Sequence, residues 1–200
     1  MNRNFLDAKE KALAALDKAC NDKDVDAQIL SLLDDLNAFD EYYTSSSCAG
    51  RIVVLELPCI GDKQHAHFLG KWHHQITVED VTVAVKKATS GLIWILAQSP
   101  IVHVGATTTA SANHLVNLAN SCGFKHSTLK SAGKKFMVEI CSTERLDAPI
   151  GNNGTLLCRG EYLDLLVTIA NEVMERSQQK LNRLEQELHK RLSTYKTTTQ

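Results

Sequence analysis

The sequence lacks several features that would each point to a particular class of protein. Its longest apolar runs fall well short of the roughly 20 residues that a membrane-spanning helix needs. Residues 1–20 carry Glu10, Lys11, Asp17 and Lys18 where a signal peptide would be continuously apolar. We therefore expect a cytoplasmic protein that has no membrane partner.

Metal sites and nucleotide-binding fingerprints are missing too. The six cysteines are scattered, with no two of them two or three residues apart, which argues against structural zinc and predicts free thiols in the cytosol. His65, His67, His73 and His74 could gather on one strand, but no carboxylate or cysteine lies at ligand spacing, so solvated histidines and no metal are expected. The glycine-rich fingerprint of doubly wound nucleotide-binding domains is absent. The net charge of −1 neither requires nor excludes a nucleic-acid partner.

The most concentrated polar stretch is residues 43–52, which predicts a loop between a helical pattern and a β-branched run. Four successive hydroxyl side chains, a cysteine and a glycine precede Arg51. Backbone N–H groups and hydroxyls in such a turn can form a nest for an anion, and a guanidinium suits phosphate or carboxylate. A serine-rich turn that ends in a surface arginine is the alternative, and the spacing favours neither.

Hydrophobic periodicity predicts an α+β fold. The expected elements are helices at 5–20 and 29–39, strands at 52–57 and 65–74, a helix at 78–88, strands at 92–97 and 101–105, a helix after 111, a hairpin at 124–141, two short extended pieces and a long helix from Glu161. The run at 92–97 is almost entirely apolar, which predicts a strand buried on both faces. Because hairpins and single helices alternate without a βαβ rhythm, we predict one domain over 1–200, with a mixed, strongly curved sheet flanked by helices and a frayed tail at 193–200.

Four further features invite a functional or a structural interpretation. Thr107 opens a hydroxyl-rich helix start that could bind an anion or simply cap the helix. His103, in an apolar strand, reads in isolation as a satisfied core histidine. The neighbours Lys71 and Trp72 could offer a base-stacking platform, or the tryptophan could belong to the core. A basic edge for phosphates, or a solvated hairpin, is indicated by four lysines: Lys125, Lys130, Lys134 and Lys135.

The segment 45–52, with the sequence Ser-Ser-Ser-Cys-Ala-Gly-Arg-Ile, resembles the signature of the wybutosine-synthesising protein 3 family. The resemblance continues in order to about Leu188, through Gly70-Lys71-Trp72-His73, Pro100, His103-Val104, Gly123-Phe124, Ser127, Pro149, Tyr162 and Asn171. At Ser99, Thr107 and Cys141 the chain departs from the family pattern of an acidic residue and two arginines.

The resemblance implies transfer of a methyl group from S-adenosylmethionine to a ring nitrogen of the tricyclic guanosine derivative beside the anticodon of phenylalanine tRNA, in wybutosine or wyosine formation. The cofactor-binding residues that we expect are Ser45, Ser46, Ser47, Cys48, Gly50, Arg51 and Thr107. The catalytic candidates are His73 and His103, and the residues expected to bind nucleic acid are Lys71, Trp72, Lys125, Lys134 and Lys135. The charged C-terminal half of the long helix could pack on the N-terminal helices or on a second subunit, so a homodimer is possible.

Two other classes of function remain open. A non-catalytic tRNA-binding accessory protein, or a divergent paralogue of the family, would use the same surface without methyl transfer. A thiol enzyme would use Cys48 as nucleophile and His73 or His103 as base, but methyl transfer needs no such nucleophile and the sequence shows no orienting carboxylate.

Overall fold

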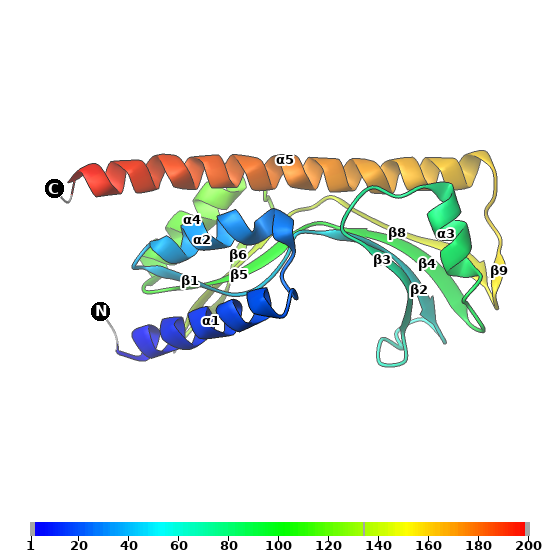
Figure 1. Cartoon of the computed structure of the whole chain (residues 1–200), viewed down its shortest axis with the longest axis horizontal. Helices are drawn as coiled ribbons and strands as arrows, with labels where there is room; N and C mark the ends of the chain where they lie inside the picture. The colour runs from blue at the N-terminus through cyan, green and yellow to red at the C-terminus, as the bar shows by residue number, and fades with distance from the viewer. Residues whose placement is uncertain (1–2, 134, 199–200) are drawn as a thin grey trace. The chain divides into compact units, whose positions relative to one another are not determined.

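The computed structural model describes residues 3–133 and 135–198, with side chains as far as Leu192 (Figure 1). The chain forms two compact units. The first takes the described residues of 1–49, 100–143 and 177–200, and the second takes residues 50–99 and 144–176. In the described part of the chain, no helix is long and apolar enough to span a membrane. The predicted α+β class and the long C-terminal helix are confirmed.

The first unit is built on a four-stranded sheet in the order β1-β5-β7-β6, and all its pairings are antiparallel. Its strands are β1 (Tyr42–Cys48), β5 (Ile101–Ala106), β6 (Thr128–Ala132) and β7 (Phe136–Cys141). Its helices are α1 (Arg3–Asn21), the 3₁₀ turn η1 (Ala27–Ile29), α2 (Leu30–Ala38), α4 (Thr109–Ser121) and the part of α5 (Glu161–Thr198) from Ser177 onward.

One face of this sheet is buried and the other is not. Val102 and Val104 of β5 pack with α2, α4 and α5 into a single core cluster, to which α5 contributes Leu181 and Leu184. Because side chains alternate along a strand, His103 projects from the opposite face. That face therefore carries the polar side chains, and only part of it is covered, where Phe5 of α1 packs on Tyr43 with ring centroids 5.2 Å apart.

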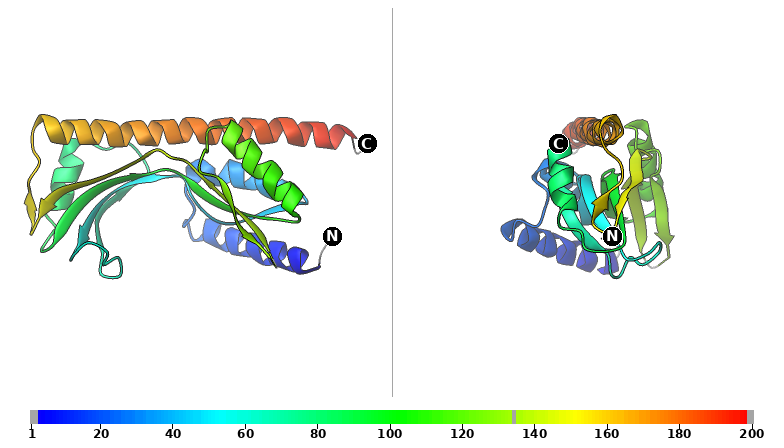
Figure 2. Two further views of the ribbon diagram at one scale, coloured as in Figure 1. Left: turned by 180° about the vertical axis from the view of Figure 1, so that it is seen from behind. Right: turned by 90° about the vertical axis from the view of Figure 1, so that its right-hand side faces the viewer.

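The second unit is built on a five-stranded antiparallel sheet in the order β3-β2-β4-β8-β9, which curls into a half-barrel (Figures 1 and 2). Its elements are β2 (Arg51–Leu57), β3 (His67–Trp72), α3 (Val78–Val85), β4 (Leu92–Gln98), β8 (Arg145–Asn152), β9 (Thr155–Leu156) and α5 up to Arg176. Ile52, Val54 and Ile95 pack against α3 and α5 in a second core cluster.

Three details differ from the sequence-based expectations. The segment 43–48 is a strand and not a loop, because pairing with β5 and burial of Tyr42, Tyr43 and Thr44 outweigh the low strand propensity of serine. Residues 92–97 are buried on one face only, since Trp94 and Leu96 face away from the helices. The sheet is neither single nor mixed: the described strands form two sheets, both antiparallel.

Two expectations about domain organisation stay open. The chain divides into two compact units, and this division does not test whether residues 1–200 form one domain, so that statement stays a prediction. The frayed tail expected at 193–200 lies outside the residues whose side chains are described.

Asn171 of α5 is expected to stabilise the second unit through a two-point clamp. Its Nδ2 donates to the carbonyl of Ile76 at 2.8 Å and its Oδ1 accepts from the Ile76 N–H at 2.8 Å. Asn171→Leu should lower the free energy of unfolding by about 2 kcal/mol, since two buried backbone groups lose their partners. Urea denaturation measures the loss. Asn171→Asp, which retains an acceptor and loses the donor, should lose less; equal stability of all three proteins would contradict the clamp.

Candidate functional site

A chain of four polar side chains crosses the partly covered face of the first sheet. Ser46 Oγ lies 2.9 Å from His103 Nδ1, and His103 Nε2 lies 2.9 Å from Glu139 Oε2. The other oxygen of Glu139 lies 2.8 Å from Lys130 Nζ. Ser46 of β1 and Glu139 of β7 are the cross-strand partners of His103 on either side, which is why the three side chains meet on one face. We call this set the Ser46–Lys130 network.

The charge states of the network follow from these contacts. The hydrogen bond from Lys130, and secondarily the one from His103, lowers the pKa of Glu139 below its ordinary value of 4.5. Glu139 is therefore ionised at neutral pH and accepts a hydrogen bond from the Nε2–H of His103. In neutral His103 this leaves Nδ1 as an acceptor, toward which the Ser46 hydroxyl donates. The imidazole is thus oriented by a carboxylate on one side and joined to a hydroxyl on the other.

A cavity of about 220 Å³ opens beside this network. One wall is strand β1, with Ser45, Ser46 and Ser47. The lining outside β1 comes from α1, from the segment that leads into α2 and from α2 itself: Ala12, Ala15, Leu16, Ala19, Asp24, Val25 and Leu33. A ligand here would meet hydroxyls and one carboxylate against an apolar wall, and Ser46 joins the cavity to His103.

The ion pair at the end of the network predicts a pH dependence of stability. The folded-state pKa of Glu139 is lowered, so its contribution is present above the ordinary value of 4.5 and is lost as the pH falls through the lowered pKa. The pKa of Lys130 is raised by Glu139, so its contribution is present below 10.5 and is lost at higher pH. Glu139→Gln should therefore flatten the fall in unfolding free energy between pH 7 and acid pH. An unchanged acid limb in urea titrations would show that the pair is too exposed to matter.

The other predicted residues of the first unit occupy different positions. Ser45 donates to the carbonyl of His103 at 3.3 Å, and Cys48 is half-buried. Thr107 lies 3.3 Å from the hydroxyl of Ser111, next to the capping box that Thr108 and Ser111 form at the start of α4, so the helix-capping interpretation describes this segment. Thr107 is not part of the Ser46–Lys130 network.

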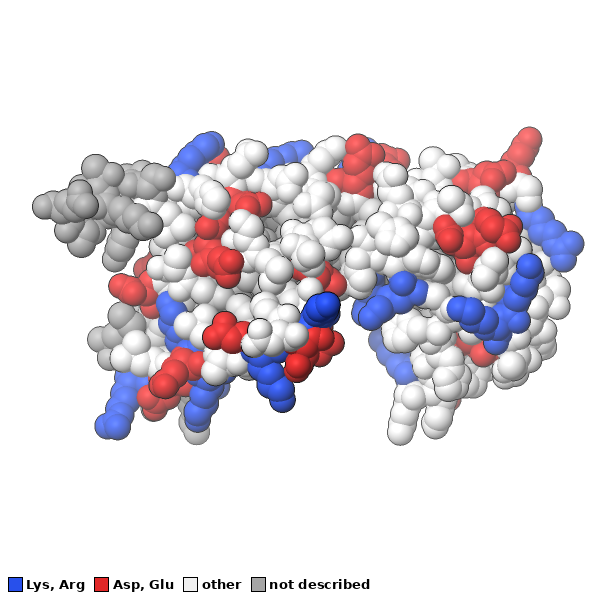
Figure 3. Space-filling view, viewed as in Figure 1, with Lys and Arg blue, Asp and Glu red and all other residues white. Residues whose placement is uncertain are grey.

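The predicted lysine edge is only partly described. Lys125 and Lys135 are exposed, while Lys134 lies outside the described residues. Lys130 forms an ion pair with Glu139. On the face seen in Figure 3, acidic and basic side chains are interspersed over α1, so that helix offers no patch of one sign there.

In the second unit, the turn that precedes β2 positions Arg51. Gly50 has φ 94°, which glycine adopts without strain, and its carbonyl accepts from His73 Nδ1 at 2.9 Å. Arg51 Nε donates to Gln98 Oε1 at 2.8 Å, and its guanidinium carbon lies 5.6 Å from the centroid of the Phe68 ring.

Lys71 and Trp72, adjacent in sequence, project from opposite faces of β3. Lys71 is exposed, whereas Trp72 is half-buried and packs against the second core. The Trp72 ring lies where a Cβ on Gly70 would be, which explains the glycine. Among the aromatic side chains of this strand, Phe68 is the exposed one.

The structure thus brings together Ser45, Ser46, Ser47 and His103 in the first unit, and Gly50, Arg51 and His73 in the second. From the sequence we expect Arg51, as a cofactor-binding residue, and His103, as a catalytic candidate, to line one pocket, and this stays a prediction. Sequence reasoning missed Glu139, the carboxylate that orients His103. Both strands were expected, but the register that pairs His103 with Glu139 was not, and no local motif signals it.

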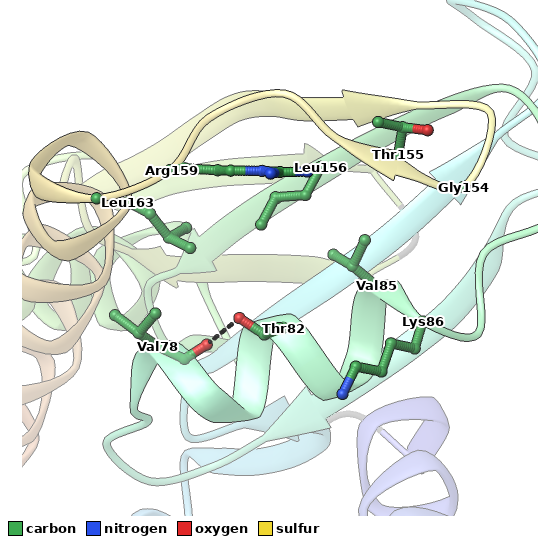
Figure 4. A pocket seen from close by; sticks show the side chains of 10 residues that line it. Val78, Thr82, Val85, Lys86, Gly154, Thr155, Leu156, Arg159 and Leu163 are labelled. Atoms are coloured by element: carbon green, nitrogen blue, oxygen red, sulfur yellow. Dashed lines mark hydrogen bonds between the residues drawn. The ribbon is translucent and has the colours of Figure 1, made fainter.

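The second unit has a separate cavity of about 490 Å³ between α3 and the segment from β9 to α5 (Figure 4). Its walls are mainly apolar, with Val78, Val85 and Leu163, and the cations Lys86 and Arg159 lie at its edge. The hydroxyl of Thr82 donates to the Val78 carbonyl at 2.8 Å. None of the cofactor-binding, catalytic or nucleic-acid-binding residues expected from the sequence lines this cavity.

Comparison with known proteins identifies the family. Residues 7–190 match the model of the family described as Methyltransferase TYW3. The chain belongs to this family. The resemblance found in the sequence is thereby confirmed, and a TYW3-family methyltransferase requires a methyl donor and an acceptor.

Relatives of this TYW3-family chain cover nearly its whole length. One is the tRNA(Phe) 7-((3-amino-3-carboxypropyl)-4-demethylwyosine(37)-N(4))-methyltransferase 1 of Pyrococcus furiosus, 50% identical over 92% of this chain and 94% of the relative. The corresponding methyltransferase 2 of Pyrococcus horikoshii is 38% identical over 92% and 90%. The solved PH1069 protein of Pyrococcus horikoshii superimposes with a TM-score of 0.90 at 49% identity, covering 92% of this chain and 96% of that one.

Proposed function

We propose that this TYW3-family chain methylates N4 of 7-(3-amino-3-carboxypropyl)-4-demethylwyosine at position 37 of tRNA(Phe), with S-adenosylmethionine as the methyl donor. The name that its relatives carry, at 50% and 49% identity over more than nine-tenths of the chain, supports this acceptor. The observation that carries the chemistry is the Ser46–Lys130 network beside a cavity. A cytoplasmic location and a homodimer through α5 remain predictions.

A proton acceptor is useful in this reaction because the demethyl acceptor nitrogen carries hydrogen. As N4 forms its bond to the methyl carbon, it must release a proton. We infer that the Ser46 hydroxyl oxygen takes up the proton from N4 as it passes its own proton to Nδ1 of His103, while Glu139 holds the ring and stabilises the imidazolium that results. The hydrogen bond from Lys130 lowers the pKa of Glu139 further below neutrality, so the carboxylate stays ionised at neutral pH.

The residues beside the network suit one end of the cofactor. Serine hydroxyls and the Asp24 carboxylate match the hydroxyl and ammonium groups of S-adenosylmethionine, and the alanines of α1 give an apolar wall. The cavity of about 220 Å³ is smaller than the roughly 300–1,000 Å³ of sites that enclose a drug-sized ligand, so it would hold part of the molecule. When bound, S-adenosylmethionine supplies an electrophilic methyl carbon, and the electron pair of the broken bond returns to sulfur. Positioning of the acceptor against that carbon then dominates the rate.

The experiment that tests the proposal uses methyl-labelled S-adenosylmethionine and tRNA(Phe) that carries the 4-demethyl nucleoside. The expected result is label in that nucleoside with the mass of one added methyl group, and no label in tRNA that is already methylated at N4. Binding of tRNA without transfer would favour the non-catalytic accessory protein. Calorimetry with S-adenosylmethionine separates the two, because only the methyltransferase has to bind it.

A further inference from the structure

The curled sheet of the second unit has a face that none of this unit's described helices covers. Ile52 and Val54 of β2 point into the core beneath α3 and α5. Arg51, Val53 and Leu55 alternate with them and therefore point the other way. The cross-strand register places Lys71 beside Val53 and Phe68 beside Leu55 on that same face.

Phe68 and Arg51 form a fixed layer on this face. Phe68 remains 58% exposed, which is unusual for so large an apolar side chain, while Val53 is fully buried. The guanidinium carbon of Arg51 lies over the Phe68 ring, 5.6 Å from its centroid, and the Nε of Arg51 is held by its hydrogen bond to Gln98. An exposed ring and a pinned guanidinium plane are thus presented together, with little freedom left to lose on binding.

The charge of the face is positive. Neither Arg51 nor Lys71 forms an ion pair with any carboxylate of the described residues. The other charged residues that the register places on this face, Arg145 and Asp147 of β8, pair with each other. Two uncompensated cations beside an exposed aromatic ring complement a ligand that has both a planar ring and a negative backbone.

We propose that Arg51, Phe68 and Lys71 form a stacking surface for an unpaired base of the tRNA anticodon loop, with Phe68 and Arg51 contacting the base and Lys71 the adjoining phosphate. The proposal rests on the proposed function, which makes tRNA the substrate. A loop base fits and a stem base does not, because bases within a duplex already have both faces covered. Aromatic and guanidinium planes are the groups on which proteins stack such bases.

The first test measures the affinity for an anticodon stem–loop RNA of tRNA(Phe) by fluorescence anisotropy. Phe68→Leu, which keeps apolar volume and removes the ring, should weaken binding about tenfold. Phe68→Trp should bind at least as well as the parent. The matched control is Tyr162→Leu, an equally exposed aromatic of the same unit, which should change affinity by less than about twofold.

Salt dependence separates the roles of the residues. Lys71→Met should lower the slope of log affinity against log salt by about one, since one phosphate contact is lost. Phe68→Leu should leave the slope unchanged and lower affinity at every salt concentration. A loop carrying photoactivatable 4-thiouridine should cross-link to β3, and the cross-link should disappear in Phe68→Leu.

The outcomes distinguish this surface from the function on which it rests. If the parent protein methylates tRNA and Phe68→Leu binds RNA as tightly, the surface is wrong and the function stands. If Phe68→Leu instead changes the oligomeric state measured by light scattering, the face is a protein interface and the proposal fails. If the parent neither binds nor methylates tRNA, the proposed function itself is wrong.

Discussion

Replacing His103 by asparagine is expected to lower the rate of methyl transfer about a thousandfold, within the 10²–10⁴ range typical of a lost general base. Asparagine can still accept a hydrogen bond from Ser46, but it cannot take up the proton that N4 releases. Affinity for tRNA should change by less than about twofold, because the network is placed for proton transfer and carries no net positive charge toward phosphate. Single-turnover methylation and anisotropy measure the two quantities separately.

Two variants sharpen this result. Glu139→Gln retains a hydrogen-bond partner for His103 but loses the charge that stabilises the imidazolium, so the rate should fall less and its pH profile should shift. His126→Asn, an exposed histidine of the same unit, is the matched control and should retain the parent rate. A rate within about threefold of the parent for His103→Asn, a difference of roughly 0.7 kcal/mol, would assign the network a structural role.

Replacing Gly105 by alanine is expected to destabilise the protein by about 3 kcal/mol, at the upper end for overpacking by one methyl group. A Cβ at this position would lie 2.2 Å from Cζ and 2.3 Å from Cε1 of the Tyr43 ring. The ring has little room to retreat, because Tyr43 is only 5% exposed and packs against Phe5. Since Tyr43 adjoins the serine stretch of β1, the cavity beside Ser46 should be disturbed as well.

Urea denaturation measures this effect, and two comparisons locate its cause. Gly133→Ala, where nothing lies within 4 Å of the new carbon, should change the unfolding free energy by less than about 0.5 kcal/mol. Combining Gly105→Ala with Tyr43→Ala should cost less than the sum of the two single changes, because removal of the ring removes the clash. Strict additivity would mean that the two residues do not meet as described.

The elements that the sequence predicts well are those with strong local periodicity. The apolar repeat of α1 and the leucine stripe of α5 are fixed by helical spacing, and both helices begin within about two residues of the expected positions. Strand β1 was predicted as a loop, because serines carry no strand preference and what makes them a strand is the backbone of β5, far along the chain. The same limit applies to β4: its uniform apolar composition does not say that helices cover one face only.

The candidate site divides in the same way. Ser46 and His103 stand out locally, one in a hydroxyl cluster and the other as a polar residue in an apolar strand. Glu139 looks like any exposed residue of a hairpin until the register of β5 with β7 places it opposite His103. Phe68 likewise becomes a candidate binding residue only once the structure shows that the guanidinium of Arg51 lies over its ring.

The way in which the chain visits its two units also bears on how the protein is made. The first unit draws on three separated segments, and its core is completed by Leu181, Leu184 and Leu188 near the end of the chain. A ribosome that has released only residues 1–143 has delivered every strand of that unit but not the helix that completes its core. Folding of this unit should therefore finish only after this part of α5 has left the ribosome, and a nascent chain arrested before α5 should be readily proteolysed.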